Sequence, residues 1–352
     1  MSPAPTLNVR RHLQDGHVIP AHPLALTPAR ALDERHQRAL TRYYVAAGAG
    51  GMAVGVHTTQ FEIREHGLLR PVLELAAETA DAALARAPRP FVKIAGLMGD
   101  TRQAVSEAEG ALALGYHAGL LSLGGWDDAP DDALLRHCRA VAATIPVMGF
   151  YLQPAVGGRR LGYRFWRELS EIANVVAIKI APFDRYATMD VVRAVAASGR
   201  DDLALYTGND DSIVVDLLTP FPVVSGGRGL ERRMVGGLLG QWAVWTHRAV
   251  AMLAEIKAAR GQPTLDAAWL RRAAALTDAN GALFDARHGF AGSIAGLHEV
   301  LRRQGLMRGV WCLDPRQRLS DGQAEEIDRV LRTYPELTDD AFVTEHRDAW
   351  LA

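Results

Sequence analysis

The stretch NVVAIKIAP, residues 174–182, decides the fold and the chemistry of this chain. It is a short apolar run, rich in β-branched residues and bounded by Asn and Pro, which is typical of a strand buried on both faces. Lys179 breaks the pattern, because it would carry an ammonium group into apolar surroundings. Burying an ammonium ion is costly unless the ion is paired or loses its proton.

Lys179 is therefore a candidate nucleophile. The chain has only three lysines, at positions 93, 179 and 257, and arginines supply the rest of its permanent positive charge. Arginine stays protonated and cannot form an imine, whereas a neutral lysine amine can attack the carbonyl carbon of a keto acid. The alternative is a lysine paired with a carboxylate in a barrel interior.

Composition narrows the class of protein. The 352 residues are 49% hydrophobic and 22% charged, which is ordinary for a globular protein, and the net charge of −1 provides no field for nucleic acid or an anionic membrane. No apolar run is long enough for a membrane span, and residues 1–16 lack the apolar segment of a secretory signal. Cys138 and Cys312 lie far apart in the sequence, so we expect a reduced, cytoplasmic protein. The histidines lack metal-ligand spacing, so we expect no metal.

Short apolar strands alternate with helical segments along the first two thirds of the chain. We predict strands at 17–27, 52–56, 91–95, 118–123, 146–151, 174–182, 203–206 and 222–225. Eight such units favour an α/β fold with a closed (β/α)8 TIM barrel. An open doubly wound sheet is the alternative, but the Gly-rich segment 48–51 precedes a strand and does not open a helix, so the dinucleotide fingerprint is missing.

This pattern divides the chain into three parts. Residues 1–15 are expected to form a loose N-terminal arm, residues 16–230 the barrel, and residues 231–352 a C-terminal helical region. Within the last part we predict helices at 238–259, 265–278, 293–304 and 322–333.

Polar side chains follow several predicted strands at the end of the barrel where active sites lie. They are Thr58, Thr59, Tyr151, Lys179, Asn209, Asp210 and Ser225. A phenol beside an imine can move protons, and paired hydroxyl and N–H donors can hold a carboxylate. Two neighbours extend this set: His57 is a candidate acid or base, and Gln153 is a candidate substrate contact. Arg64 is an outside candidate for binding an anionic substrate.

The chain resembles the dihydrodipicolinate synthase / N-acetylneuraminate lyase family of class I aldolases. The resemblance rests on AVGVHTTQFE (53–62), VKIAGLMGDTRQAV (92–105), PVMGFYLQPAVGG (146–158), NVVAIKIA (174–181) and YTGNDDSIV (206–214), and it extends to RRQGLMRG (302–309). The Tyr-x-x-Pro segment followed by the Ile-Lys strand is its most specific part. The resemblance implies a (β/α)8 barrel with a C-terminal helical region, assembled as a homo-oligomer, either a dimer or a tetramer.

The resemblance also assigns roles to residues. It implies that Lys179 forms the imine, that Tyr151 relays protons, and that Thr58 and Thr59 bind the carboxylate of the keto acid. His57, Gln153, Asn209 and Ser225 complete the expected substrate-binding set. No cofactor is expected beyond the covalent imine, and the expected partners are a small-molecule 2-keto acid and, as a candidate, an aldehyde.

Three departures separate this chain from the family pattern. The usual Gly and Glu of the Thr-Thr loop are replaced by Gln60 and Phe61, and the Tyr-Tyr pair after the fourth strand is replaced by the segment 123–126. The arginine that synthases place after the fifth strand aligns with Val156, with Arg159 or Arg160 as candidate substitutes. Authentic dihydrodipicolinate synthesis is therefore not expected.

The sequence thus predicts a Schiff-base class I aldolase or lyase that acts on pyruvate or a related 2-keto acid. Dehydration of a sugar acid through the same imine is one alternative. The other is a non-catalytic protein that binds keto acids or sugar acids on the same scaffold.

Overall fold

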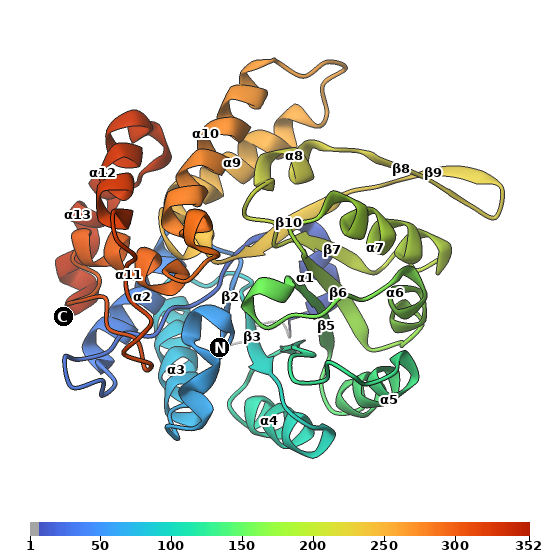
Figure 1. Cartoon of the computed structure of the whole chain (residues 1–352), viewed down its shortest axis with the longest axis horizontal. Coiled ribbons are helices and arrows are strands. Elements are labelled where there is room, and N and C mark those ends of the chain that lie inside the picture. The colour runs from blue at the N-terminus through green and yellow to red at the C-terminus, as the bar shows by residue number, and fades with distance from the viewer. Residues whose placement is uncertain (1–6) are drawn as a thin grey trace.

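A computed structural model of the chain describes residues 7–352 and contains one parallel eight-stranded sheet (Figure 1). The strands follow the order β1-β10-β7-β6-β5-β4-β3-β2. Their bounds are β1 (Val18–Pro20), β2 (Gly51–Val54), β3 (Val92–Leu97), β4 (Ala118–Leu121), β5 (Val147–Leu152), β6 (Val175–Ala181), β7 (Ala204–Thr207) and β10 (Met234–Leu239). A parallel bridge between Ala21 and Ala53 joins the two ends of the sheet. The predicted (β/α)8 barrel is confirmed.

Helices cover the outside of this barrel. They are α2 (Glu34–Ala46), α3 (Leu69–Arg86), α4 (Thr101–Ala113), α5 (Asp131–Ala142), α6 (Tyr163–Ser170), α7 (Arg185–Ala197), α8 (Ile213–Leu218) and α9 (Thr246–Ala259). Three of them begin at an aspartate whose side chain accepts from N–H groups of the first turn: Asp33, Asp100 and Asp184. Such caps satisfy donors that have no partner within the helix, and so fix where each helix leaves the strand before it.

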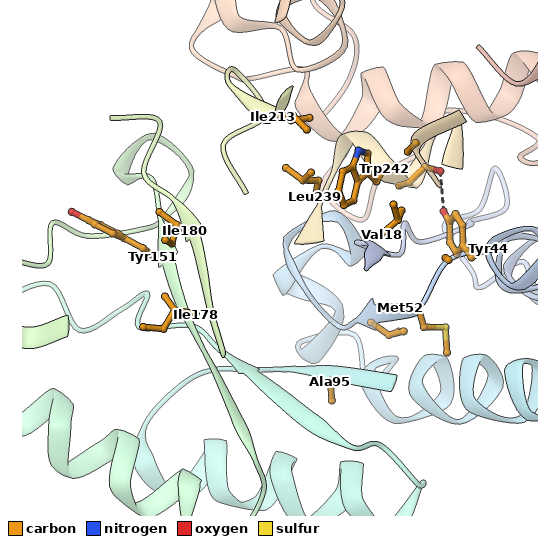
Figure 2. Packing of buried hydrophobic residues seen from close by; sticks show 14 of the residues in the cluster. Val18, Tyr44, Met52, Ala95, Tyr151, Ile178, Ile180, Ile213, Leu239 and Trp242 are labelled. Atoms are coloured by element: carbon orange, nitrogen blue, oxygen red, sulfur yellow. Dashed lines mark hydrogen bonds between the residues drawn. The ribbon is translucent and has the colours of Figure 1, made fainter. Parts of the chain in front are cut away.

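The two faces of β6 serve different cores. Ile178 and Ile180 belong to the cluster between the sheet and its helices, whereas Val176, Ala177 and Ala181 belong to the cluster inside the barrel. Figure 2 shows Ile178 and Ile180 projecting to one side of β6, where they pack in the outer cluster. The side chain of Lys179 therefore lies on the inner face of the barrel.

The eighth barrel strand is β10, and the predicted strand at 222–225 is wrong as a barrel strand. That segment is β8 (Phe221–Ser225), which pairs antiparallel with β9 (Arg228–Arg232) in a hairpin that projects from the barrel (Figure 1). The connecting glycines, Gly226 and Gly227, have φ of 56° and 75°, and two successive positive φ values are what a type I′ hairpin turn needs.

The barrel consequently runs past the predicted boundary at residue 230. The predicted helix at 238–259 is two elements: β10 ends at Leu239 and α9 begins at Thr246. Two glycines inside β10 obscured the strand pattern. A Cβ on Gly236 would lie 2.5 Å from the backbone of His17, and a Cβ on Gly237 would lie 2.7 Å from the ring of Trp242, so close packing requires glycine at both positions.

The N-terminal segment is not a loose arm over the residues that the structure describes; the part of this prediction that falls on residues 1–6 lies outside them. Helix α1 (Val9–Asp15) lies against β6 and β7. Leu13 is fully buried in the inner cluster, and its carbonyl accepts a hydrogen bond from the Tyr206 hydroxyl at 2.8 Å. This helix therefore closes the end of the barrel opposite the carboxyl ends of the strands.

The C-terminal region is helical, as predicted. It contains α10 (Ala268–Leu283), α11 (Ser293–Arg303), α12 (Gln323–Thr333) and α13 (Asp340–Leu351), of which α13 was not predicted and packs against α2. Short 3₁₀ turns complete the chain: η1 (His57–Thr59), η2 (Phe61–Arg64), η3 (Pro154–Val156), η4 (Gln241–Ala243), η5 (Ala286–His288) and η6 (Pro335–Leu337). Within residues 7–352, no helix combines the length and the apolar character that crossing a membrane would take.

Candidate active site

A cavity of about 60 Å³ lies where β5, β6 and β7 end. A single buried water occupies a cavity of about 10–15 Å³, so this cavity is large enough for several waters or a small organic molecule. Its polar lining comes from His57, Thr58, Gln153, Lys179, Asp210 and Ser293. The carboxyl ends of barrel strands are where active sites of this fold are found.

Lys179 reaches the cavity from the inner face of β6, and its side chain is buried, with only 8% exposed. Its Nζ lies 4.3 Å from the ring centroid of Phe150, the residue opposite it on β5. Gly208 makes room for this side chain, because a Cβ there would lie 2.6 Å from Lys179 Cε. Burial lowers the pKa of Lys179, and the negative charge of Asp210 partly opposes that effect.

A second buried lysine shows what the structural alternative looks like. Lys93 on β3 is 5% exposed, and its Nζ lies 2.7 Å from the carboxylate of Asp81. Within the part of the chain that the structure describes, no carboxylate lies within 4 Å of Lys179 Nζ. Lys93 therefore has the paired arrangement expected of a structural lysine, and Lys179 does not.

Asp210 is the cavity's acidic group, at the end of the strand next to β6. Its Oδ1 accepts a hydrogen bond from the Gln241 N–H at 3.2 Å, while burial raises the pKa of the carboxyl and Lys179 opposes that rise. A buried acid and a buried amine whose pKa values are shifted toward each other can exchange a proton near neutral pH. The sequence placed Asp210 at a strand end without giving it a role.

Tyr151, the expected proton relay, is not among the residues that line the cavity. Figure 2 shows its side chain projecting away from β5 on the same side as Ile178 and Ile180. Its ring packs on Trp166 of α6 at 5.0 Å between centroids, and its hydroxyl accepts from the Leu161 N–H at 3.3 Å. Side chains alternate along a strand, so an inward Phe150 requires an outward Tyr151.

The two threonines of the turn after β2 have different surroundings. Thr58 lines the cavity, and the N–H groups of His57 and Thr58 stand at the start of η1, where N–H groups lack helical partners. Thr59 is turned away from the cavity: its hydroxyl donates to the His22 carbonyl at 2.7 Å and accepts from the Gly55 N–H at 2.9 Å. In this structure the Thr59 hydroxyl therefore holds the turn that presents Thr58, and its expected contact with the keto acid stays a prediction.

His57 and Gln153 lie on the cavity as expected. Burial, with a smaller effect of Lys179, lowers the pKa of His57 to about 4, so its imidazole is neutral at pH 7. Gln153 follows the end of β5 and is the last residue before η3. A neutral imidazole and an amide can donate to or accept from a ligand without adding charge.

Asn209 is not among the described residues that line the cavity. Asn209 is buried, and its side chain accepts from the Phe183 N–H at 3.0 Å and donates to Asp216 at 2.9 Å. It therefore fixes the backbone on either side of the cavity and does not contact its interior. Ser225 ends β8, where its backbone pairs with Arg228. Its side chain lies outside what the structure describes, so the expected substrate contact stays a prediction.

The candidate arginines are also held elsewhere. Arg64 makes a pair of hydrogen bonds with Glu107, at 2.8 and 2.9 Å, and Arg159 donates to the carbonyls of Trp126 and Ala129. Neither Arg64, Arg159 nor Arg160 is among the residues that line the cavity. Lys179 is the only cationic side chain among the described residues of its lining.

Sequence reasoning missed the aromatic side of the cavity. Phe183 comes from the loop after β6, while Phe284 and Phe290 come from the C-terminal region, and Phe150 lies beneath Lys179. The apolar side chains near the ends of the predicted barrel strands could have indicated Phe150 and Phe183. The other two come from a region that has no strand periodicity to place it.

Comparison with known proteins agrees with this geometry. The sequence model of the dihydrodipicolinate synthetase family matches residues 16–221. The chain is 27% identical over 210 residues to a 4-hydroxy-tetrahydrodipicolinate synthase of Cyanothece sp., which covers 58% of this chain and 66% of that protein. It is 30% identical over 202 residues to a protein of the same name from Acidothermus cellulolyticus, covering 55% and 60%. The chain thus spans less than two thirds of the length of these curated relatives.

Solved structures with the same fold cover nearly the whole chain. YagE, a prophage protein from E. coli K12 in complex with pyruvate, superimposes with a TM-score of 0.74 at 16% identity, covering 91% of this chain and 98% of that one. CdNal from Clostridium difficile in complex with mannosamine gives 0.72 at 14% identity, covering 91% and 99%. At these identities the likeness concerns the fold.

Proposed function

The chain belongs to the dihydrodipicolinate synthetase family, and on that premise we propose that it is a class I aldolase that acts on pyruvate or a related 2-keto acid through an imine on Lys179. One observation carries the proposal: a buried lysine amine faces a cavity, beside a carboxyl group and without an ion-pair partner among residues 7–352. Because burial lowers the pKa of Lys179, a larger fraction of the amine is neutral and nucleophilic at neutral pH.

The keto acid would bind with its carboxylate at the turn after β2. Two N–H groups at the start of η1, those of His57 and Thr58, are suited to hold an anion. Lys179 then attacks the keto carbon, and the loss of water leaves a protonated imine. This cation draws electrons from the adjacent carbon, which is what bond cleavage or formation at that carbon requires.

Asp210 would move the protons that the reaction needs. The family resemblance gave this task to Tyr151, whose hydroxyl lies outside the cavity, so a different group must perform it here. Asp210 lines the cavity, and its burial raises the pKa of the carboxyl, so it can both accept and donate a proton near neutral pH. The Gln241 N–H holds one of its oxygens in place.

The lining of the cavity favours an aldolase over the alternatives considered. Authentic dihydrodipicolinate synthesis uses an anionic second substrate, and no arginine among the described residues lines this cavity. A sugar acid would need several hydrogen-bonding partners along its length, whereas the outer part of the cavity is apolar. A binding protein without turnover would not need a carboxyl group with a raised pKa beside the amine.

Borohydride trapping tests the proposal. The protein is incubated with pyruvate and sodium borohydride, digested, and analysed by mass spectrometry. We expect one reduced adduct, on the peptide that contains Lys179, and the same adduct in Lys257→Ala, since Lys257 contacts only the carbonyls of Asp15 and Gly16 below the barrel. An adduct on another lysine, or none with saturating pyruvate, refutes the proposal.

A further inference from the structure

The outer part of the cavity, which we call the mouth, is built from apolar side chains of four segments. It comprises Val156 from η3, Phe183 from the loop after β6, Phe284 from the end of α10, and Phe290 from the loop before α11. Val156, Phe183 and Phe290 are partly exposed, so this side of the cavity is the one that reaches solvent. A ligand that enters toward Lys179 must pass these side chains.

Two of these phenylalanines hold an unfavourable backbone conformation. Phe183 has φ of 52° and Phe290 has φ of 71°, in the left-handed region that bulky residues rarely adopt. The Asn209 side chain holds the N–H of Phe183 at 3.0 Å, and the Asp285 carbonyl holds that of Phe290 at 3.0 Å. Left-handed residues other than glycine persist where the surroundings impose them, and they cluster at ligand clamps.

The rings of Phe183 and Phe290 contact each other at the cavity. Their centroids lie 5.7 Å apart with an interplanar angle of 74°, an edge-to-face arrangement. Phe284 lies nearby, where it restricts Gly240: a Cβ on that glycine would lie 3.1 Å from the Phe284 ring and 3.4 Å from Thr58. The arrangement leaves aromatic surface facing the space next to Lys179.

The mouth has no cationic group that could pair with an anion, and Ser293 beside it supplies one neutral hydroxyl. Lys179 is the only cation among the described residues that line the cavity, and Arg159 is held by the carbonyls of Trp126 and Ala129. A charged group placed among these phenylalanines would lose its hydration without gaining a partner. A polyhydroxylated group would leave most of its hydroxyls unpaired.

From these observations we infer that the second substrate of the proposed aldolase is an uncharged aldehyde with an aromatic ring, which packs among Phe183, Phe284 and Phe290. Edge-to-face and offset-stacked contacts favour an aromatic ring over an aliphatic group of similar size. The inference rests on the proposed function, because it assumes a keto-acid imine on Lys179.

The reaction balances without an oxidant or a reductant. In the direction of synthesis, the enamine formed from pyruvate on Lys179 donates its carbon–carbon π electrons to the aldehyde carbon, and a carbon–carbon bond forms. The electron pair of the aldehyde C=O moves to oxygen, which takes a proton from the acid in the cavity. Water then hydrolyses the imine, frees the amine and releases a 4-aryl-4-hydroxy-2-keto acid; cleavage is the reverse.

An aldehyde panel tests this inference separately from the imine. Pyruvate is combined with benzaldehyde, glyceraldehyde or succinic semialdehyde, and product formation is followed by liquid chromatography and mass spectrometry. We expect kcat/KM for benzaldehyde to exceed that for either of the other two by at least about tenfold, in proportion to aromatic packing that they cannot make.

Two variants test whether the mouth causes the preference for benzaldehyde. Phe290→Gly and Phe183→Gly each remove a ring and also relieve the left-handed backbone, so both are expected to fold. Each should lower kcat/KM for benzaldehyde by roughly tenfold and leave borohydride trapping with pyruvate unchanged. Tyr186→Ala is the matched control, because this aromatic residue on α7 is 88% exposed and does not line the cavity.

The outcomes separate the two claims. An adduct on Lys179 together with a preference for benzaldehyde that the glycine variants remove supports the inference. An adduct together with equal or better turnover of glyceraldehyde or succinic semialdehyde overturns the inference alone, as does an adduct with no turnover of any aldehyde. The absence of an adduct overturns the proposed function and, with it, the inference.

Discussion

The inner part of the cavity and its mouth differ in chemistry. Around Lys179 the lining includes the polar groups of Asp210, Gln153 and His57 above the ring of Phe150, and it comes from the ends of barrel strands and the turns after them. At the mouth the lining is aromatic, and much of it comes from the C-terminal region. Under the proposed function, the ends of the barrel strands would set the reaction at the keto acid, and segments outside the strand pattern would determine what reacts with it.

Replacing the amine itself should have the largest effect. Lys179→Ala removes the group that forms the imine, so we expect turnover with pyruvate and an aldehyde to fall by at least about 10³-fold. Steady-state kinetics check this result, with Lys257→Ala as a control that also removes one lysine. If Lys179→Ala retained turnover, the inner part of the cavity would not be the site of the chemistry.

Replacing the neighbouring carboxyl group should have the next largest effect. Asp210→Asn keeps the shape of the side chain but removes its proton transfer, so we expect kcat to fall by roughly 10²- to 10³-fold while trapping on Lys179 persists.

The same variant has a defined pH effect. The charge of Asp210 raises the pKa of Lys179, so its loss should lower that pKa and shift the rise of the trapping rate with pH toward lower pH. A trapping profile that stays in place, or moves to higher pH, would show that the two groups do not interact.

Giving the mouth a cation should change its preference. Val156 lines the cavity and is partly exposed at the mouth. We expect Val156→Arg to raise kcat/KM for succinic semialdehyde by about tenfold and to lower it for benzaldehyde, because a buried carboxylate gains a charged partner. Val156→Met, which adds length without charge, is the matched control. Equal changes in kcat/KM in the two variants would mean that the size of residue 156, and not its charge, determines which aldehyde is preferred.

Removing the hydroxyl of Tyr151 should have the smallest effect. Tyr151→Phe loses one hydrogen bond from the Leu161 N–H, which costs about 1 kcal/mol of folding free energy, and we expect kcat to change by less than about threefold. Thermal unfolding and steady-state kinetics measure the two quantities on the same sample. Removing a general acid–base group is expected to lower turnover by roughly a hundredfold or more. A loss of that size would show that Tyr151, and not Asp210, transfers the protons.

Much of the fold was predictable from residue patterns. The barrel class, seven of its strands and the place of Lys179 within one of them follow from apolar runs of strand length. The eighth strand could not be predicted in this way, because Gly236 and Gly237 interrupt its apolar pattern. The hairpin segment 221–225 has the apolar pattern of a barrel strand, so the pattern indicates that segment instead. The Gly226-Gly227 pair between two strand-like runs was the signal that could have distinguished them.

The site was predictable only where residue type sets the chemistry. An unpaired lysine in an apolar strand indicates a function whatever its neighbours are, and that prediction gained support from the geometry. The place of Tyr151 depends on a one-residue alternation that a motif alone does not fix, since Phe150 beside it takes the inward position. Phe284 and Phe290 reach the cavity through tertiary packing of the C-terminal region, which no local pattern encodes.

A crystal of the protein soaked with pyruvate would show directly whether Lys179 forms the imine. We expect continuous density from Lys179 Nζ to the C2 atom of the keto acid, with the carboxylate at the turn after β2, Asp210 beside the imine and Tyr151 still packed on Trp166. Pyruvate bound without a bond to Lys179, or a Tyr151 ring turned inward so that its hydroxyl meets the imine, would contradict this expectation.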